Sequence, residues 1–143
     1  MNVTRYDPRC RDDLARLWLE SWRSTGVETG ETVAVEDLAA RIDDEIAGGW
    51  RVWLAWRDHV LVGFLALLPG RLDQLFIAPA AQGGGVGTAL LDIAKREEPD
   101  GLRLRTAAAN RRARRFYEAR GFHLAGTGPH PRLGYETATY RWP

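Results

Sequence analysis

Residues 82–88 form a glycine-rich segment whose composition points to the binding of an anion. The segment reads Gln-Gly-Gly-Gly-Val-Gly-Thr, and it lies between an apolar stretch that ends at Ile77 and a helical pattern that begins at Val86. Glycines lack a Cβ atom, so successive backbone N–H groups can turn toward one point. The N-terminus of a helix adds free N–H groups and a partial positive charge. The residues that predict a phosphate-sized anion site are Gln82, Gly83, Gly84, Gly85, Val86, Gly87 and Thr88.

Two nucleotide-binding fingerprints do not fit this segment. A P-loop requires Lys before its Ser or Thr, whereas Gly87 precedes Thr88 in this chain. A dinucleotide-binding loop requires a third glycine at the position where Thr88 stands. The spacing that does occur is Gln82-x-x-Gly85-x-Gly87, and a tight strand-to-helix connection without any ligand is its alternative interpretation.

A second segment, residues 110–122, combines a helical pattern with a phenol group. It follows the pattern N-x-x-A-x-x-F-Y-x-x-x-G-F, which predicts a helix that Gly121 closes. Tyr117 on this helix carries a hydroxyl that can donate a proton. The spacing of Tyr117 is also that of a core aromatic residue whose hydroxyl reaches the rim of the core.

Together, the two segments resemble the GNAT superfamily of acetyl-CoA-dependent N-acetyltransferases. They occur in the family's order after an apolar strand that ends Phe76-Ile77-Ala78-Pro79, and the close match spans Leu72 to Phe122. The resemblance implies a GNAT fold with acetyl-CoA as the co-substrate. It implies that the loop of residues 82–88 holds the pyrophosphate of coenzyme A, and that the strand backbone around Phe76 and Ile77 pairs with the pantetheine arm.

The resemblance also implies roles for three residues of the second segment. Asn110 would hydrogen-bond the pantetheine, Ala113 would be small enough to let the cofactor pass, and Tyr117 would protonate the departing thiolate. This chain departs from the family pattern at Gly84, where family loops often carry Lys or Arg. Either the affinity for coenzyme A is lower, or other cations supply the charge. The candidates are Arg111, Arg112, Arg114 and Arg115, whose alternative role is a solvated helix face.

The implied reaction is direct attack by a primary amine within a ternary complex. An alkyl amine has a pKa near ~10.4 and must lose a proton before it attacks. Asp73, on the strand that precedes the glycine-rich loop, is a candidate general base. Its alternative role is that of an ion-pair partner at a strand edge.

Residues that bind the acceptor amine are predicted from position alone. Trp22, Glu28 and His130 lie in or beside the loops that are expected to form the acceptor pocket. The sequence has no extended acidic or basic track, so we expect a small-molecule acceptor. A protein or peptide amine is an alternative acceptor, and a catalytically silent acyl-CoA-binding module is an alternative function.

Periodicity predicts a mixed α/β fold in one N-acetyltransferase domain over residues 1–143. We expect a mostly antiparallel sheet of about six to seven strands with about four helices on both faces. The predicted helices are one capped by Asp12 or Asp13, Glu36–Ala47, Val86–Glu97, and one from Asn110 or Arg111 to Arg120. The predicted strands are Arg51–Trp56, Val60–Leu68, Leu72–Ile77, Leu102–Thr106, Phe122–Ala125 and Tyr135–Trp142.

Composition limits the possible function classes. The 143 residues include 20 basic and 19 acidic ones, a balance that excludes a strongly basic nucleic-acid binder. The stretch 73–143 holds 11 basic and 7 acidic residues, which favours an anionic ligand there. The single Cys10 and three scattered His residues lack zinc-ligand spacing, so no metal is expected. With no signal peptide or membrane span apparent, we expect a cytoplasmic monomer or homodimer with no membrane partner.

Overall fold

The computed structural model describes residues 1–24 and 33–143, apart from the side chains of Trp22 and Ser24. Within this part of the chain, seven strands form one sheet in the order β1-β2-β3-β4-β5-β7-β6. The strands are β1 (Asn2–Arg5), β2 (Arg51–Arg57), β3 (Val60–Leu68), β4 (Arg71–Ile77), β5 (Leu102–Ala107), β6 (His123–Pro129) and β7 (Glu136–Trp142). The α-helices are α1 (Arg11–Ser24), α2 (Val35–Ala47), α3 (Val86–Glu97) and α4 (Arg111–Glu118). None of these helices is long and apolar enough to cross a membrane.

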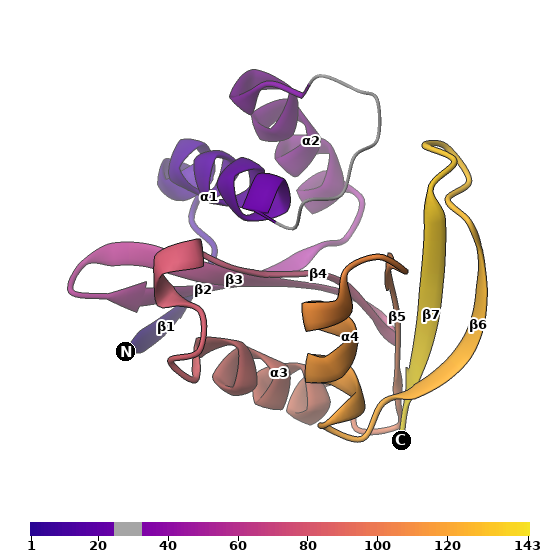
Figure 1. Cartoon of the computed structure of the whole chain (residues 1–143). Coiled ribbons are helices and arrows are strands. Elements are labelled where there is room, and N and C mark those ends of the chain that lie inside the picture. Colours follow the sequence, from indigo (N-terminus) through magenta and orange to yellow (C-terminus); the bar gives the residue numbers. More distant parts are fainter. Residues whose placement is uncertain (25–32) are drawn as a thin grey trace.

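Helices cover both faces of the sheet, with α1 and α2 on one side and α3 and α4 on the other (Figure 1). Leu54 and Phe64 are fully buried against the α1–α2 layer. Their chain neighbours Trp53 and Leu65 belong to the cluster under α3 and α4, because successive side chains of a strand point to opposite faces. Burial on both faces explains why β2 and β3 are almost continuously apolar.

The predicted fold class is confirmed, including the mostly antiparallel sheet and the helices on both of its faces. The predicted bounds of β3 and α3 match the structure. β6 is longer than predicted, because the predicted strand ends at Ala125 and the strand in the structure continues to Pro129. Gly126 and Gly128 look like turn residues, yet both pair with β7 beyond a register shift between Leu124 and Gly126.

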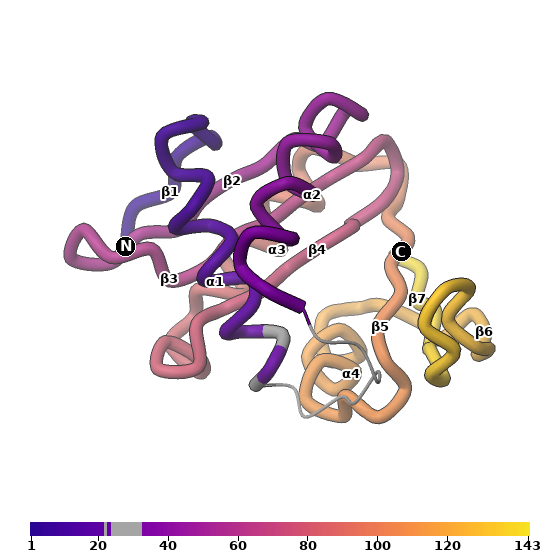
Figure 2. Tube along the Cα trace, turned by 90° about the horizontal axis from the view of Figure 1, so that it is seen from above, coloured from indigo at the N-terminus to yellow at the C-terminus, as the bar shows by residue number. Residues whose placement is uncertain are grey.

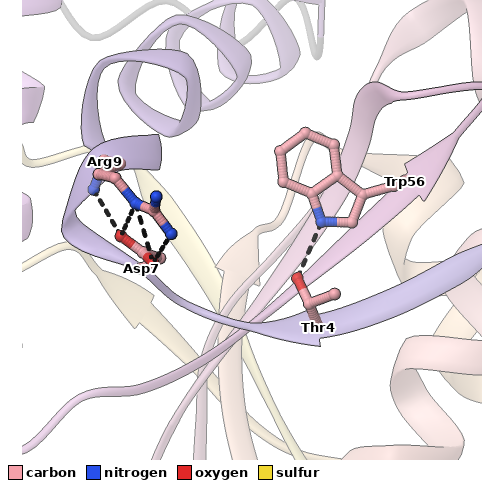
Figure 3. A network of polar contacts seen from close by, with 4 residues as sticks. All are labelled: Thr4, Asp7, Arg9 and Trp56. Atoms are coloured by element: carbon pink, nitrogen blue, oxygen red, sulfur yellow. Dashed lines mark hydrogen bonds and ion pairs between the residues drawn. The ribbon is translucent and has the colours of Figure 1, made fainter.

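The N-terminus differs from the prediction in two respects. The sequence assigns the cap of the first helix to Asp12 or Asp13, but Asp7 accepts the Arg9 N–H at 2.9 Å and caps a 3-10 helix, Pro8–Cys10, that leads into α1 (Figure 3). The sequence also misses β1, a short, mostly exposed strand. It pairs with β2, and the Trp56 Nε1–H donates to Thr4 Oγ1 at 2.9 Å (Figure 3). An exposed edge strand lacks the apolar alternation that periodicity detects.

The sheet opens between β4 and β5. These two parallel strands share the single register pair Arg71 and Arg103, and the Arg103 N–H donates to the Gly70 carbonyl at 3.0 Å. Beyond this pair the strands run apart (Figure 2). Each strand stays paired to its other neighbour, β4 to β3 and β5 to β7. The sheet therefore consists of a four-stranded half, β1 to β4, and a three-stranded half, β5 to β7.

Candidate active site

A cavity of about 730 Å³ lies where the two halves of the sheet separate. Residues of β4, β5, α2 and α4 line it, together with the turn between β6 and β7. It brings together predicted site residues that are distant in the sequence. Those that line the cavity are Asp73, Phe76, Asn110, Ala113, Tyr117 and His130.

The free edge of β4 presents backbone polar groups to the opening between the strands. The Ala78 N–H donates to the Val62 carbonyl at 2.8 Å, which sets the alternation of the β3–β4 ladder. In an antiparallel ladder, the next residues along the strand turn their N–H and C=O groups the other way. Ile77 and Leu75 therefore face away from β3. The backbone of Phe76 faces β3 instead, so Leu75 takes the place beside Ile77 that the sequence assigns to Phe76.

The glycine loop begins just beyond the end of β4, outside the cavity lining. Gly83 and Gly85 have left-handed φ angles of 83° and 86° on either side of Gly84. A Cβ added at Gly83 or Gly85 would meet nothing within 4 Å, so the space in front of both residues is open. Gly85 is also the N-cap of α3 and has no side chain to cap the free N–H groups. The loop therefore offers uncapped donors to an anion.

The side chains at the two ends of the loop are used within the fold. Gln82 Nε2 donates to the Ile77 carbonyl at 3.2 Å, and this carbonyl also accepts the Ser21 hydroxyl. Thr88 Oγ1 accepts two hydrogen bonds from the Arg120 guanidinium, at 3.0 and 3.2 Å. Gln82 and Thr88 thus hold the loop in place. The backbone N–H of Gln82 donates to the Pro79 carbonyl at 3.4 Å, whereas that of Thr88 lies in the first turn of α3 and can contribute to anion binding.

Gly87 allows α3 and α4 to approach each other closely. A Cβ at Gly87 would lie 3.2 Å from the Phe116 ring on α4, a distance that forces one of the two groups to shift. Val86 beside it is 1% exposed and anchors the start of α3 in the core. The glycine at position 87 therefore serves packing, in contrast to Gly83 and Gly85.

Tyr117 is a buried phenol whose hydroxyl has no hydrogen-bond partner among the described residues. It is 6% exposed, and its ring contacts Phe116 and Phe122 edge to face. Burial raises the pKa of Tyr117 well above its ordinary value of about 10. The group therefore keeps its proton at neutral pH and is in the right form to act as a general acid.

Asn110 and Ala113 lie at the N-terminus of α4. Asn110 Oδ1 accepts the Ala113 N–H at 3.2 Å and so caps the helix. Within the described structure, the amide nitrogen of Asn110 has no partner and can donate to a ligand in the cavity. The methyl side chain of Ala113 lines the same wall and takes up little space.

The contacts of Asp73 include the ion pair that was predicted as its alternative role, and its role as a general base stays a prediction. Asp73 lines the cavity, and it also forms an ion pair with Arg71 at 3.4 Å. Its other oxygen accepts the Trp50 indole N–H at 2.7 Å. Each carboxylate oxygen has a second lone pair, so Asp73 can still accept a proton from an amine or a water molecule.

Of the residues predicted to bind the acceptor amine, the structure describes the side chain of His130 alone. His130 lines the cavity, and its Nδ1 accepts the backbone N–H groups of Arg132 and Leu133 at 3.1 and 3.0 Å. The His130 ring stacks on Tyr135 with a centroid separation of 5.0 Å. His130 therefore organises the β6–β7 turn as well as the cavity wall. The Trp22 side chain and Glu28 lie outside the described residues.

The arginines at the start of α4 differ in the contacts that they make. Arg114 donates to the Tyr140 hydroxyl at 3.0 Å and to the Ala108 carbonyl at 3.1 Å, so its guanidinium stabilises the fold. Arg111, Arg112 and Arg115 are exposed. This exposure matches the solvated helix face that the sequence left as an alternative.

Comparisons with known proteins point to one family. The sequence model of the acetyltransferase (GNAT) domain matches residues 40–124. YiaC of Escherichia coli K12, a peptidyl-lysine N-acetyltransferase, is 29% identical over 133 residues, which cover 91% of this chain and 88% of that protein. The crystal structure of a ribosomal-protein-alanine N-acetyltransferase from Brucella melitensis has a TM-score of 0.78 and 19% identity, covering 99% of this chain and 98% of that one. The structure of yncA from Salmonella typhimurium with its cofactor acetyl-CoA has a TM-score of 0.77 and 15% identity, covering 99% and 92% of the two chains.

Proposed function

The chain belongs to the GNAT family of acetyltransferases, and from this premise we propose that it transfers the acetyl group of acetyl-CoA to a primary amine of a small molecule. The predictions of an N-acetyltransferase and of acetyl-CoA as its co-substrate are confirmed. The acceptor and the roles of individual residues are part of the proposal, as is a single N-acetyltransferase domain over residues 1–143.

The four-stranded half of the sheet binds the co-substrate in this proposal. Backbone N–H groups of residues 82–88 hold the pyrophosphate at the start of α3. The backbone of Leu75 and the N–H of Ile77, on the edge of β4 that faces away from β3, pair with the pantetheine arm, and one N–H of this edge polarises the thioester carbonyl. Bound acetyl-CoA supplies the acetyl group as a thioester.

In this proposal, Asp73 and Tyr117 carry out the two proton transfers of the reaction, one at the attacking amine and one at the leaving sulfur. The amine must lose a proton to become a nucleophile, and Asp73 accepts that proton directly or through water. As the C–N bond forms and the C–S bond breaks, negative charge develops on sulfur. Tyr117 donates its hydroxyl proton to that sulfur, which makes the thiol a better leaving group.

One observation carries the proposal. The hydroxyl-bearing Tyr117 and the edge of β4 at Leu75 lie in the wall of the same cavity, where β4 has diverged from β5 beyond the register pair of Arg71 and Arg103. A module that only binds acyl-CoA would use the strand edge and the loop. It would need the Tyr117 ring for packing but would have no use for its hydroxyl.

The charges that line the described part of the cavity bear on the acceptor. Four arginines and one histidine face three aspartates there. Arg41, Arg105 and Arg132 come from α2, β5 and the β6–β7 turn, so basic groups surround the site from three directions. A polycationic amine would meet net repulsion in this lining. A small amine that is neutral or that also carries an anionic group fits it better.

A lysine side chain of a protein is the second candidate acceptor. The observation that favours it is the likeness to YiaC, which is named a peptidyl-lysine N-acetyltransferase and aligns with 91% of this chain. A lysine side chain also presents a single primary amine on a flexible apolar stem.

The first experiment is calorimetric titration of acetyl-CoA, followed by an amine panel with release of free thiol as the readout. We expect one saturable site that is lost in Gly85→Val, where φ is left-handed, and kept in the control Gly126→Val on exposed β6. The panel pairs amino acids with their amides, and free lysine with a lysine-containing peptide. Faster turnover of the peptide would favour the second candidate. No binding at millimolar acetyl-CoA would overturn the proposal.

A further inference from the structure

A guanidinium group from outside the glycine loop lies against the middle of that loop. Arg57 is the last residue of β2, and the β2–β3 hairpin lies on the same side of the molecule as the loop before α3 (Figure 1). The Arg57 Nη2–H donates to the Gly84 carbonyl at 3.4 Å. A Cβ added at Gly84 would lie 3.1 Å from Arg57 Nη2 and 3.3 Å from Nη1. The guanidinium therefore occupies the space that a side chain at position 84 would enter.

The positive charge of Arg57 has no carboxylate partner among the described residues. Arg51, at the other end of the same strand, forms ion pairs with Glu97 and Glu98 at 3.3 and 2.7 Å. Arg57 is absent from the ion pairs of the described structure and is held by a neutral carbonyl. Its half-buried position places that charge beside the loop and keeps it partly out of water.

The loop and the first turn of α3 carry no negative charge to balance Arg57. Residues 78–88 contain no acidic residue, and the first turn of α3 has none either. Helices commonly carry an acidic residue at this end because the N-terminus is partially positive. The guanidinium, the free N–H groups and the helix terminus therefore combine into one uncompensated positive region, which favours a multiply charged anion.

We propose that Arg57 is a coenzyme A-binding residue that donates to a phosphate oxygen of the co-substrate at the glycine loop. The inference rests on the proposed function, because it takes the loop to be the phosphate site. It also accounts for Gly84, which stands where family loops often carry Lys or Arg, because Arg57 of β2 supplies the positive charge that the loop itself lacks. The phosphate is either the pyrophosphate or the 3′-phosphate, which share the same chemistry.

The geometry allows a variant in which position 84 of the loop carries the positive charge in place of Arg57. The φ angle of Gly84 lies outside the left-handed range, so an L-residue can be accommodated there. The atoms nearest to a side chain at position 84 would be the guanidinium nitrogens of Arg57, and truncation of Arg57 removes this steric obstacle. The double variant Arg57→Ala/Gly84→Arg thus carries the same net charge as the wild type at nearly the same place.

The test measures the dissociation constants of coenzyme A and dephospho-coenzyme A by calorimetry at low and high salt. For Arg57→Ala we expect about tenfold weaker binding of coenzyme A at low salt, with a smaller loss at high salt. Arg57→Lys and the double variant should recover part of that loss. The control Arg96→Ala removes an exposed cation at the far end of α3 and should bind as the wild type does.

Dephospho-coenzyme A, which lacks the 3′-phosphate, identifies the group that Arg57 contacts. An equal loss with both ligands assigns Arg57 to the pyrophosphate, and a loss confined to coenzyme A assigns it to the 3′-phosphate. Unchanged affinity in Arg57→Ala overturns the inference while leaving the proposed function intact. A loss that is independent of salt and not recovered by the double variant would also overturn it, because Arg57 would then only shape the loop. Failure of the wild type to bind coenzyme A would instead reject the proposed function.

Discussion

The two halves of the sheet are both well paired internally, yet they meet through one register pair. In the four-stranded half, β3 and β4 pair from Gly63 with Ile77 to Leu68 with Arg71. In the three-stranded half, β5 pairs with β7 along its whole length. A continuous sheet would satisfy the edge of β4 with β5. Here the Ile77 carbonyl of that edge accepts Ser21 and Gln82, while the Ile77 N–H and the backbone of Leu75 are left for a ligand. A peptide strand adds to a sheet edge through the same backbone groups.

The halves also contribute different kinds of groups to the cavity between them. The four-stranded half supplies backbone groups of β4 and the Asp73 side chain, and the glycine loop lies just beyond the cavity lining. The three-stranded half, with α4, supplies Tyr117 and Asn110, and its turn supplies His130. Substitutions in the first half should mainly change co-substrate affinity or activation of the amine. Substitutions of the α4 phenol should mainly change turnover.

Tyr117→Phe should give the largest effect and is the direct test of this division. Loss of a general acid typically costs 10²- to 10⁴-fold in rate, so we expect kcat to fall at least about 100-fold. The coenzyme A dissociation constant should stay within about twofold, because the phenyl ring keeps its contacts with Phe116 and Phe122. Steady-state thiol release and calorimetry measure the two quantities. Undiminished turnover would show that the phenol only packs.

Gly87→Val should disturb the close packing of α4 on α3. The added side chain meets the Phe116 ring, so α4 must shift away from α3. We expect a loss of about 1–3 kcal/mol in the free energy of unfolding and roughly tenfold weaker binding of acetyl-CoA. Denaturant unfolding and calorimetry report these values. Gly126→Val, which meets no neighbour, is the matched control, and equal behaviour of the two variants would argue against a packing role for Gly87.

Asp73→Asn tests whether Asp73, in the four-stranded half, acts as a general base or only as an ion-pair partner. The amide oxygen can still accept the Trp50 indole N–H, so shape is retained while the charge is lost. We expect kcat/KM at pH 7 to fall about tenfold, with a smaller loss at higher pH where the amine is already deprotonated. Trp50→Phe is the control, since it removes the hydrogen bond and keeps the carboxylate. A pH-independent loss shared by both variants would assign Asp73 to structure alone.

The smallest expected effect is a pH dependence of stability that Tyr117 causes. Burial raises its pKa in the folded state, so below about pH 10 the folded and unfolded chains both hold the proton and stability is unaffected. Above that pH the unfolded chain loses the proton first, and the free energy of unfolding falls by about 1.4 kcal/mol per pH unit. Denaturant unfolding at pH 9 to 11 should show this fall in the wild type to be steeper than in Tyr117→Phe. Parallel curves would mean that the hydroxyl reaches water.

Much of the fold and part of the candidate site follow from local sequence. The apolar run Val60–Leu68 predicts a strand buried on both faces, and the period from Val86 to Glu97 predicts a helix, because each pattern is read within one element. The short polar strand β1 and the glycine-containing end of β6 carry no such pattern. Their pairing with β2 and β7 comes from partners far along the chain.

The amino-acid sequence alone indicated the family and the co-substrate, and it predicts anion binding at the glycine loop, since glycines and a helix start act within a few residues. Tertiary structure decided which backbone groups of β4 face the opening, because the β3 ladder sets that alternation. It also decided that Asp73 has Trp50 and Arg71 beside it. Finally, it placed Arg57 against Gly84, 27 residues away. Contacts of this kind depend on sheet register and strand divergence, which local spacing does not encode.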